Sequence, residues 1–321
     1  MTTSEGSLPA QGRGWGVLLL AHGAPDNLAD IPEFLLNVRG GRKLPDAAVE
    51  EIIRRYKLIG GSPLLKLTNL QAHALERELK LPVYVGMRNW KPFIGEALER
   101  IVADGVERVV ALCLAPHNSR TSIGLYRKYL DEARVKIVPT LRVDFIENWH
   151  DHPLLIGAFR EKLAQGIDRA RAEAGGEVPV IFTAHSVPEK TIAAGDPYRR
   201  QVTETAALIA EAIGPDDLPR YRVAFQSQGM TAEPWIGPTV ESQIDELAAA
   251  GQKFVLLAPI GFVSDHVEIL YDIDILFRGY GQERGVTVLR TESLNDSPPF
   301  IRTLASLVSE RIGAVTAGGA L

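Results

Sequence analysis

Short apolar runs alternate along the chain with longer segments in which apolar residues recur every three or four positions. The short runs have the length and the β-branched residues of buried strands, and the longer segments have the period of amphipathic helices. Strands are predicted at 16–20, 82–85, 108–114, 135–139, 178–183, 222–225, 253–258 and 286–290. Helices are predicted at 47–59, 64–79, 94–103, 121–133, 153–174, 198–213, 238–249 and 266–277. This alternation predicts an α/β fold in which helices cover both faces of parallel sheets.

The two halves of the chain share several short motifs in the same order. Leu20-Ala-His-Gly-Ala-Pro25 resembles Thr183-Ala-His-Ser-Val-Pro188, and Leu114-Ala-Pro116 matches Leu257-Ala-Pro259. Agreement between several motifs in one order indicates an internal duplication. We therefore predict two similar domains, each with a four-stranded parallel sheet flanked by helices.

The repeat also predicts where the domains begin and end. The first domain is expected at 15–149 and the second at 150–313, with a disordered tail at 1–14 and a flexible tail at 314–321. The first half carries an extra segment at 26–60, whose part at 39–57 has six lysines and arginines against three acidic residues. This insertion is therefore expected to be locally basic.

Composition narrows the classes of function. The 321 residues carry a formal net charge of −5, so there is no overall positive field to bind nucleic acid. The apolar runs are far shorter than the roughly 20 residues that cross a bilayer, and the N-terminus does not resemble a signal peptide. The single cysteine, Cys113, allows no internal disulfide. We expect a cytoplasmic protein with no transmembrane segment and no nucleic-acid partner.

Several polar residues lie where predicted strands end. These are His22, His117, His185 and the turn 261–268. Ligands of open parallel sheets bind beyond the carboxyl ends of the strands, so these groups are expected to converge on one cavity. At such an apolar rim the ring of His185 is expected to be neutral, able to bind a divalent metal or accept a proton. The alternative is a structural histidine bonded to nearby backbone.

The turn after the seventh strand carries a group of acidic residues. Asp265, Glu268 and Asp272 are separated by three and four positions, which predicts three carboxylates along one helix face. Glu268 also fits a capping-box position, in which its carboxylate would bond to backbone N–H. Spacing alone leaves both interpretations open. Phosphate-loop, dinucleotide-binding and Gly-x-Ser-x-Gly motifs are absent from the sequence.

Five segments resemble the signature segments of ferrochelatases, in order and within a match from about Trp15 to Gly313. They are Phe182-Thr-Ala-His-Ser-Val-Pro188, Gly195-Asp-Pro-Tyr198, Gln226-Ser-Gln-Gly229, Pro234-Trp-Ile-Gly-Pro238 and Pro259-Ile-Gly-Phe-Val-Ser-Asp-His-Val-Glu268. The resemblance implies two Rossmann-like (chelatase-like) domains with a porphyrin between them. It implies a lyase of haem biosynthesis that inserts Fe²⁺ into a porphyrin with release of two protons. Iron and porphyrin are then substrates, haem is the product, and no cofactor is required.

The resemblance also assigns roles to residues. His185 and Glu268 correspond to the family's catalytic histidine and carboxylate, and we expect them to face each other across a gap wide enough for a tetrapyrrole. With Asp272 they are the expected metal-binding residues. Some relatives carry a glutamate where this chain has Leu276, so an outer metal site that rests on that glutamate is not expected here.

The remaining expected porphyrin contacts come mostly from the first half. His22 replaces a tyrosine of relatives that act on coproporphyrin, and a ring nitrogen there is suited to binding the product iron. Cavity-lining residues that meet propionates are expected at Arg39, Arg55, Tyr56, Ser62 and Tyr126, although each also fits a surface charge or a turn. The insertion lacks a long apolar lip, and a basic rim suits the four carboxylates of coproporphyrin III better than protoporphyrin IX.

Two alternatives remain at this point. The chain could be a cobalt or nickel chelatase of another tetrapyrrole pathway, or a non-catalytic carrier of haem or porphyrin. Besides porphyrin and ferrous iron, the resemblance leaves room for transient contact with neighbouring haem-pathway enzymes or an iron donor.

Overall fold

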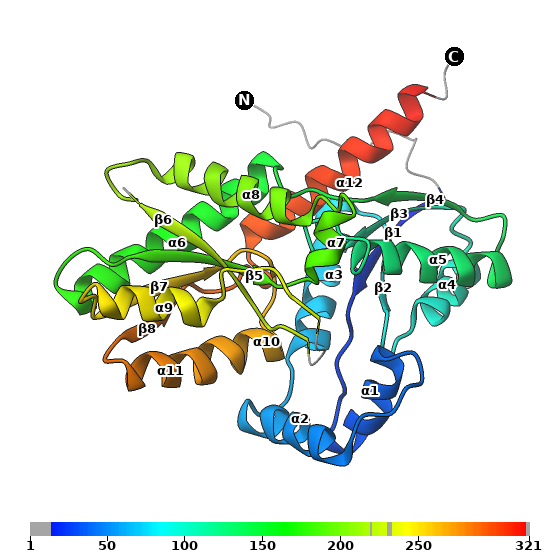
Figure 1. Cartoon of the computed structure of the whole chain (residues 1–321). Coiled ribbons are helices and arrows are strands. Elements are labelled where there is room, and N and C mark those ends of the chain that lie inside the picture. Colours follow the sequence, from blue (N-terminus) through cyan, green and yellow to red (C-terminus); the bar gives the residue numbers. More distant parts are fainter. Residues whose placement is uncertain (1–13, 219, 230–232, 319–321) are drawn as a thin grey trace, which may run out of the picture.

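Two parallel β-sheets organise the computed structural model of the chain, which describes residues 14–218, 220–229 and 233–318 (Figure 1). The first sheet has the order β2-β1-β3-β4, with β1 (Trp15–Ala21), β2 (Val83–Met87), β3 (Arg108–Cys113) and β4 (Arg142–Ile146). The second has the order β6-β5-β7-β8, with β5 (Val180–His185), β6 (Tyr221–Gln226), β7 (Phe254–Pro259) and β8 (Thr287–Arg290). The identical order confirms the predicted fold of two duplicated, four-stranded α/β domains.

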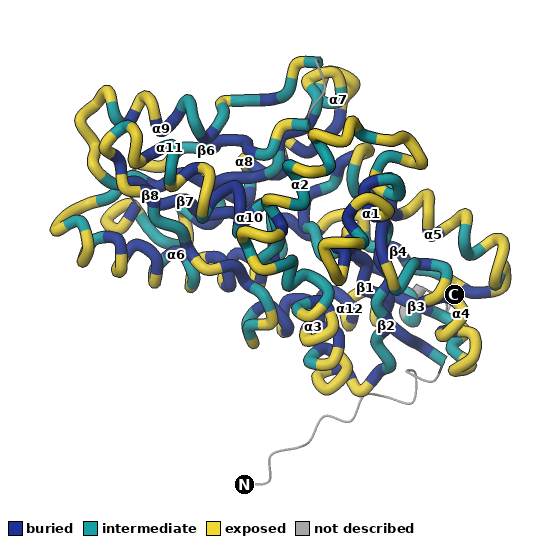
Figure 2. Tube along the Cα trace, turned by 90° about the horizontal axis from the view of Figure 1, so that it is seen from below, coloured by how far each residue is buried: buried dark blue, intermediate teal, exposed yellow. Residues whose placement is uncertain are grey.

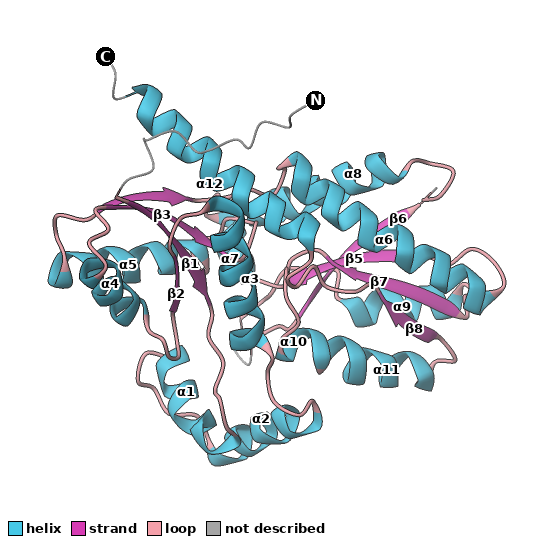
Figure 3. Ribbon diagram, turned by 180° about the vertical axis from the view of Figure 1, so that it is seen from behind, coloured by secondary structure: helices cyan, strands magenta, loops and turns pink. Residues whose placement is uncertain are grey.

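Helices lie on both faces of each sheet (Figure 3). The first half contains η2 (Leu28–Asp30), α1 (Ile31–Val38), α2 (Asp46–Leu58), α3 (Leu64–Leu79), α4 (Ile94–Ala103) and α5 (Ile123–Ile137). The second half contains α6 (Pro153–Ala174), α7 (Glu189–Ala193), α8 (Tyr198–Ile213), α9 (Val240–Ala249), α10 (Val267–Leu270), η3 (Asp272–Phe277), α11 (Arg278–Glu283) and α12 (Pro298–Gly318). Among the described residues, no helix is long and apolar enough to cross a membrane.

One large apolar cluster joins the two domains. It includes Leu19 of β1, Leu75 of α3, Phe182 of β5 and Phe300 of α12, all fully buried. Figure 2 shows the central strands as a largely buried interior, with most exposed residues on the outer faces of helices and in loops. Because both central strands contribute to this cluster, the strand ends that carry His22 and His185 are held in a fixed relation.

The fourth strand lies later in the chain than the sequence predicts. The apolar run at 135–139 was expected to form it, but α5 continues to Ile137 and the strand is Arg142–Ile146. Val135 and Ile137 lie on the last turn of the helix and are 62% and 37% exposed. Their β-branched side chains therefore suggested a buried strand where there is none. The strand lies at a sheet edge, and in it the charged residues Arg142 and Asp144 alternate with apolar ones.

The C-terminal part of the chain also differs from expectation. A flexible tail was predicted at 314–321, but residues 314–318 continue α12. This helix packs against α3 of the first half, and Phe300 stacks on Trp149 with ring centroids 6.1 Å apart. The predicted tail at 1–14 falls outside the described residues up to residue 13, and residues 319–321 are also outside them.

The insertion at 26–60, which over its whole length carries as many acidic as basic residues, forms a small unit of its own beside the second domain. Helices α1 and α2 enclose a separate apolar cluster that contains Phe34, Tyr56 and Trp90. From α2, Arg54 donates to the hydroxyl of Tyr271 at 2.7 Å, and the guanidinium of Arg55 lies 4.9 Å from the centre of the same ring. The insertion thus reaches the segment of the second domain that carries Glu268 and Asp272.

Candidate active site

The side chains of His185 and Glu268 touch each other. Nε2 of the histidine, at the end of β5, lies 3.5 Å from Oε1 of the glutamate in α10, and the two side chains are 34% and 32% exposed. The prediction of a gap between them is therefore wrong for this structure. Both side chains belong to one wall of the site.

The contact arises because the chain after β7 folds back over the end of β5. The backbone N–H groups of Ile260 and Gly261 donate to the carbonyl of Thr183, at 2.9 and 3.1 Å. A Cβ atom on Gly261 would lie 2.6 Å from the Cβ of Ala184, so glycine is required for this close approach. The turn that follows is thereby placed directly over His185.

Glu268 controls the charge of His185. Burial alone would lower the pKa of the imidazole, but the opposite charge of Glu268 outweighs it and raises the pKa of His185 to about 9. The carboxyl responds in the opposite sense: burial would raise the pKa of Glu268, yet the positive charge of His185 holds it well below its usual value. The expected neutral ring is thus corrected to a charged one, because the glutamate is adjacent.

Two further contacts fix the orientation of Glu268. Its second oxygen, Oε2, lies 3.6 Å from Nε2 of His266, whose Nδ1 donates to the carbonyl of Ser264 at 2.9 Å. The backbone carbonyl of Glu268 accepts from the side-chain amide of Gln226 at 2.9 Å. The carboxylate is therefore held between two imidazoles and does not cap its own helix, which was the alternative interpretation.

Asp272 lies one turn further along the same segment. It begins the π-helical turn η3, and its carboxylate accepts a hydrogen bond from the hydroxyl of Ser227. Burial, and then the negative charge of Glu268, raise the pKa of Asp272 to about 6. Among the residues that the structure describes, no group of three or more His, Cys, Asp or Glu side chains is placed to hold a metal ion. The three predicted metal-binding residues are neighbours, but not a ready-made metal cage.

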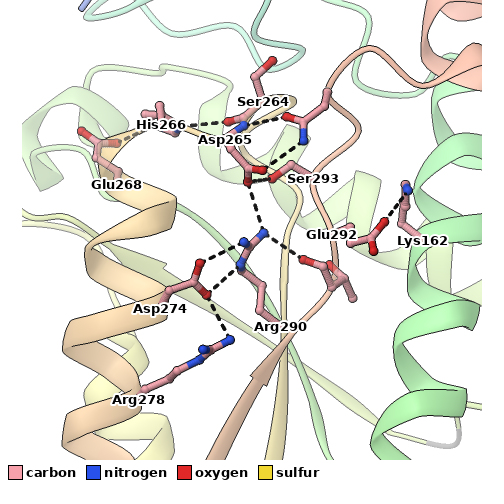
Figure 4. Close-up of polar contacts among 12 residues, drawn as sticks. Lys162, Ser264, Asp265, His266, Glu268, Asp274, Arg278, Arg290, Glu292 and Ser293 are labelled. Atoms are coloured by element: carbon pink, nitrogen blue, oxygen red, sulfur yellow. Dashed lines mark hydrogen bonds and ion pairs between the residues drawn. The ribbon is translucent and has the colours of Figure 1, made fainter. Parts of the chain in front are cut away.

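Asp265 does not share a face with the other two carboxylates, contrary to the sequence prediction. Its carboxylate accepts from Ser293 at 2.7 Å, from Asn295 at 3.0 Å and from Nη1 of Arg290 at 3.3 Å (Figure 4). Arg290 also holds Asp274, which lies further along the helical segment that carries Glu268 (Figure 4). The reason is that Asp265 precedes α10 and so does not follow its helical period.

His22, from the end of β1, belongs to the same site. The residue is solvent-exposed, yet partial desolvation of its ring by surrounding protein atoms, and then the charge of Arg88, lower its pKa to about 4. The charges of Glu268 and His266 also act on this ring, which places all three in one electrostatic neighbourhood. Nδ1 bonds to the carbonyl of Gly23 at 3.1 Å, so it carries the proton and Nε2 keeps its lone pair.

Of the five residues predicted to meet propionates, three show contacts or electrostatic effects that place them near the His185–Glu268 pair, and two do not. Tyr56, Arg55 and Tyr126 are close to the site: the charge of Glu268 adds to burial in raising the pKa of Tyr56, Arg55 acts on Asp272, and Tyr126 is buried under Arg88. Arg39 has a buried Nε atom without a hydrogen-bond partner in the described part of the chain. Ser62 lines a cavity of about 480 Å³ beside the loop Ala24–Asp26, with Lys66 and His73 among its other walls.

His117 was expected in the cavity and lies behind it. Its Nε2 bonds to the hydroxyl of Thr205 at 3.0 Å, and its ring packs against Tyr198, whose hydroxyl donates to the carbonyl of His185. Sequence reasoning missed Arg88, Ser227 and Tyr198 as contacts of the site. Tyr198 and Ser227 stand within two of the quoted signature segments, but nothing in their spacing indicates which atoms they meet.

The comparison with known families settles which class of protein this geometry belongs to. A family model described as ferrochelatase matches residues 14–312. The chain belongs to the ferrochelatase family. The predicted reaction class, a lyase that inserts a metal ion into a porphyrin in haem biosynthesis, is thereby confirmed, and iron and porphyrin are the substrates that the family implies.

Individual relatives of the ferrochelatase family match over nearly their full length. The chain is 46% identical to a ferrochelatase of Acidobacterium capsulatum, with 95% of this chain and 96% of the relative covered. It is 38% identical to a coproporphyrin III ferrochelatase of Geobacillus thermodenitrificans, with 92% and 96% covered. Among solved structures, the sirohydrochlorin chelatase SirB of Bacillus subtilis in complex with cobalt has a TM-score of 0.57 at 11% identity, covering 93% of this chain and 95% of that one. This last likeness concerns the fold alone.

Proposed function

We propose that the chain inserts Fe²⁺ into coproporphyrin III, with the macrocycle between His22 of the first domain and the His185–Glu268 pair of the second. The observation that carries this proposal is the pairing itself: an imidazole and a carboxylate 3.5 Å apart on one wall, with a neutral imidazole contributed by the other domain. Relatives carry both the general ferrochelatase name and the coproporphyrin III name, so the choice of porphyrin is part of the proposal.

The reaction exchanges two protons for one metal ion. Four pyrrole nitrogens bind Fe²⁺, and the two of them that carried hydrogen each lose a proton. We assign Fe²⁺ to the side of His185 and Glu268, because an imidazole nitrogen and a carboxylate oxygen suit a divalent transition metal. Iron would replace the proton that the pair shares in the free enzyme. Binding energy from the porphyrin carboxylates would hold the ring against this wall in a bent form.

The pyrrole protons need an acceptor that is largely deprotonated at neutral pH. Asp272 suits this role, because it lies one turn beyond Glu268 and its pKa of about 6 is near neutrality. His22 is a poor base by the same reasoning, since its pKa is about 4. Its free Nε2 is instead suited to binding the iron of the product haem. We therefore assign proton release to the Asp272 side.

The preference for coproporphyrin III rests on charge. The insertion contributes Arg39 and Arg55, and the end of β2 contributes Arg88, which lies over Tyr126. Charge-assisted bonds from arginines to carboxylates are among the stronger polar contacts in proteins. A substrate with four carboxylates uses more of these donors than one with two. A transient contact with an iron donor or a neighbouring pathway enzyme stays a prediction, as does the cytoplasmic location.

The test is anaerobic incubation of the full chain with Fe²⁺ and either porphyrin, with kcat/KM measured for each. We expect insertion into both and a higher kcat/KM for coproporphyrin III. A higher value for protoporphyrin IX would contradict the assigned substrate. Co²⁺ and Ni²⁺ serve as competing metals, and turnover with these but not with Fe²⁺ would favour the other chelatase class. Tight porphyrin or haem binding without turnover would favour a carrier.

A further inference from the structure

Arg88 is fixed beside His22 by the backbone. It follows the last residue of β2, and its N–H donates to the carbonyl of Ala21 at 2.9 Å. The next residue, Asn89, donates its backbone N–H to the carbonyl of His22 at 3.0 Å. These two bonds extend the pairing of β2 with β1 past the end of the sheet. The position of Arg88 relative to His22 is therefore set by the sheet itself.

The guanidinium of Arg88 lies over the ring of Tyr126, with its central carbon 4.7 Å from the ring centre. Tyr126 is only 5% exposed, so the arginine stacks on a buried surface. After partial desolvation, the charge of Arg88 is what lowers the pKa of His22. The head group of Arg88 is therefore within electrostatic range of the ring that we place against the porphyrin.

This guanidinium has a buried nitrogen with nothing to bond to. Nη1 of Arg88 has no hydrogen-bond partner, and no carboxylate lies within ion-pair distance of the side chain, among the residues that the structure describes. Arg290 is the contrasting case, since its side chain is 13% exposed and its head group is held by Asp265 and Asp274. The chain thus supplies a counter-ion to one enclosed arginine and leaves the other without one.

A buried charged donor that lacks an acceptor is unfavourable, because the group has lost water and gained nothing in return. Such a group is expected where a ligand completes the site. The planar guanidinium matches a carboxylate with two parallel N–H···O bonds, and the face stacked on Tyr126 leaves its edge for the ligand.

We propose that Arg88 binds a carboxylate of the porphyrin, on the side of the site that carries His22. This inference rests on the proposed function, because it takes the ligand to be a porphyrin. It adds a donor that the sequence resemblance did not assign. It also means that one edge of the substrate is held by the first domain through Arg88 and Tyr126, independently of the insertion.

The test is a fluorescence titration of metal-free coproporphyrin III into the full chain and its Arg88→Met variant. Methionine keeps much of the length and removes the charge and the donors. We expect the dissociation constant to rise about tenfold or more, the range of a charge-assisted hydrogen bond. The tetramethyl ester of the same porphyrin, titrated in the same dilute detergent, should bind wild type and variant equally. Arg88→Lys should recover part of the lost affinity for the acid.

The matched control is Arg108→Met. Arg108 also stacks on an aromatic ring, with its guanidinium 5.6 Å from the centre of Trp15, but at the opposite end of the sheet. This variant should bind coproporphyrin III as wild type does. Thermal unfolding of each variant checks the fold, and Arg88→Lys keeps the test usable if Arg88→Met is unstable.

Two results would overturn the site. One is unchanged affinity of Arg88→Met for coproporphyrin III, and the other is an equal loss for the acid and for its ester, which would indicate a packing role. Failure of the proposed function looks different: wild type itself would then bind neither coproporphyrin III nor protoporphyrin IX, or would bind them without inserting Fe²⁺. Repeating the titration with protoporphyrin IX locates the carboxylate. If Arg88→Met weakens the binding of protoporphyrin IX less, Arg88 binds a carboxylate that protoporphyrin IX lacks. If it weakens the binding of both porphyrins equally, Arg88 binds a carboxylate that both share.

Discussion

Arg290 forms a bidentate ion pair with Asp274: Nε lies 3.0 Å from Oδ1, and Nη2 lies 2.9 Å from Oδ2. Its third nitrogen reaches Asp265 at 3.3 Å. Asp265 begins the turn that carries Glu268, and Asp274 lies in the π-helical turn that begins with Asp272. One arginine at the end of β8 thus ties together the two segments that present the acidic groups of the site.

Removing this arginine should destabilise the chain and slow iron insertion. In Arg290→Met the carboxylate of Asp265 loses its counter-ion and that of Asp274 keeps only the exposed Arg278, so we expect the free energy of unfolding to fall by about 3 kcal/mol. Arg278 provides the control, because it pairs with the same Asp274 at 3.3 Å but its side chain is 53% exposed. Arg278→Met should cost less than about 1 kcal/mol. Urea unfolding measures the loss of stability, and kcat measures the loss of activity. Equal losses of both in the two variants would contradict the role of Arg290 in tying these segments together.

The ion pair at the centre of the site makes a prediction about protonation. NMR titration of the His185 ring should give a pKa of about 9. In Glu268→Gln the negative charge that raises the pKa of His185 is gone, while burial still lowers it. The pKa of His185 should therefore fall by more than about one unit, equivalent to about 1.4 kcal/mol. A ring that titrates near 6.5 in wild type would show that the pair does not form in solution.

The same pair should contribute to stability within a limited pH window. Because the folded-state pKa of His185 is raised, its contribution is complete below about pH 6.5 and is lost as the pH rises through 9. The lowered pKa of Glu268 contributes above pH 4.5 and is lost as the pH falls further. The stability difference between wild type and Glu268→Gln should therefore be larger at pH 7 than at pH 10. Urea denaturation at the two values measures it, and a difference that grows at pH 10 would have the wrong sign.

Gly261 should tolerate no side chain. Its Cβ would lie 2.6 Å from Cβ and 2.7 Å from Cα of Ala184, so Gly261→Ala must push the turn away from β5. We expect a loss of stability of about 1–3 kcal/mol, as for other overpacked sites, together with a fall in kcat. Gly157→Ala in α6 meets open space and should stabilise the chain by about 0.5–1 kcal/mol. Wild-type stability and kcat in Gly261→Ala would show that the close approach does not position the site.

Much of the fold follows from sequence because each domain repeats the same local signals. The central strand β1 is buried at every position and reads as one apolar run, and the motifs ending in His22 and His185 mark equivalent strand ends. The edge strand β4 was misplaced because an edge needs fewer apolar residues, while Val135 and Ile137 gave a false strand signal on an exposed helix turn. Helix α12 was not predicted at all.

The site was predictable in its residues but not in its distances. Sequence spacing placed Asp265, Glu268 and Asp272 on one helix, yet Asp265 precedes the helix and turns toward Arg290, which lies 25 residues later. The contact between His185 and Glu268, and hence the charge of the histidine, depends on Gly261 packing against Ala184. Contacts of this kind join separate strands, and no local pattern along the chain encodes them.

The central claim is that His185 takes part in metal insertion and not in holding the fold or the porphyrin. It is tested by anaerobic insertion of Fe²⁺ into coproporphyrin III by His185→Ala, with His152→Ala as a control at a histidine outside the site. We expect the rate of the His185 variant to fall by about 100-fold or more while its affinity for metal-free porphyrin stays within about twofold of wild type. Insertion at close to the wild-type rate would contradict the account.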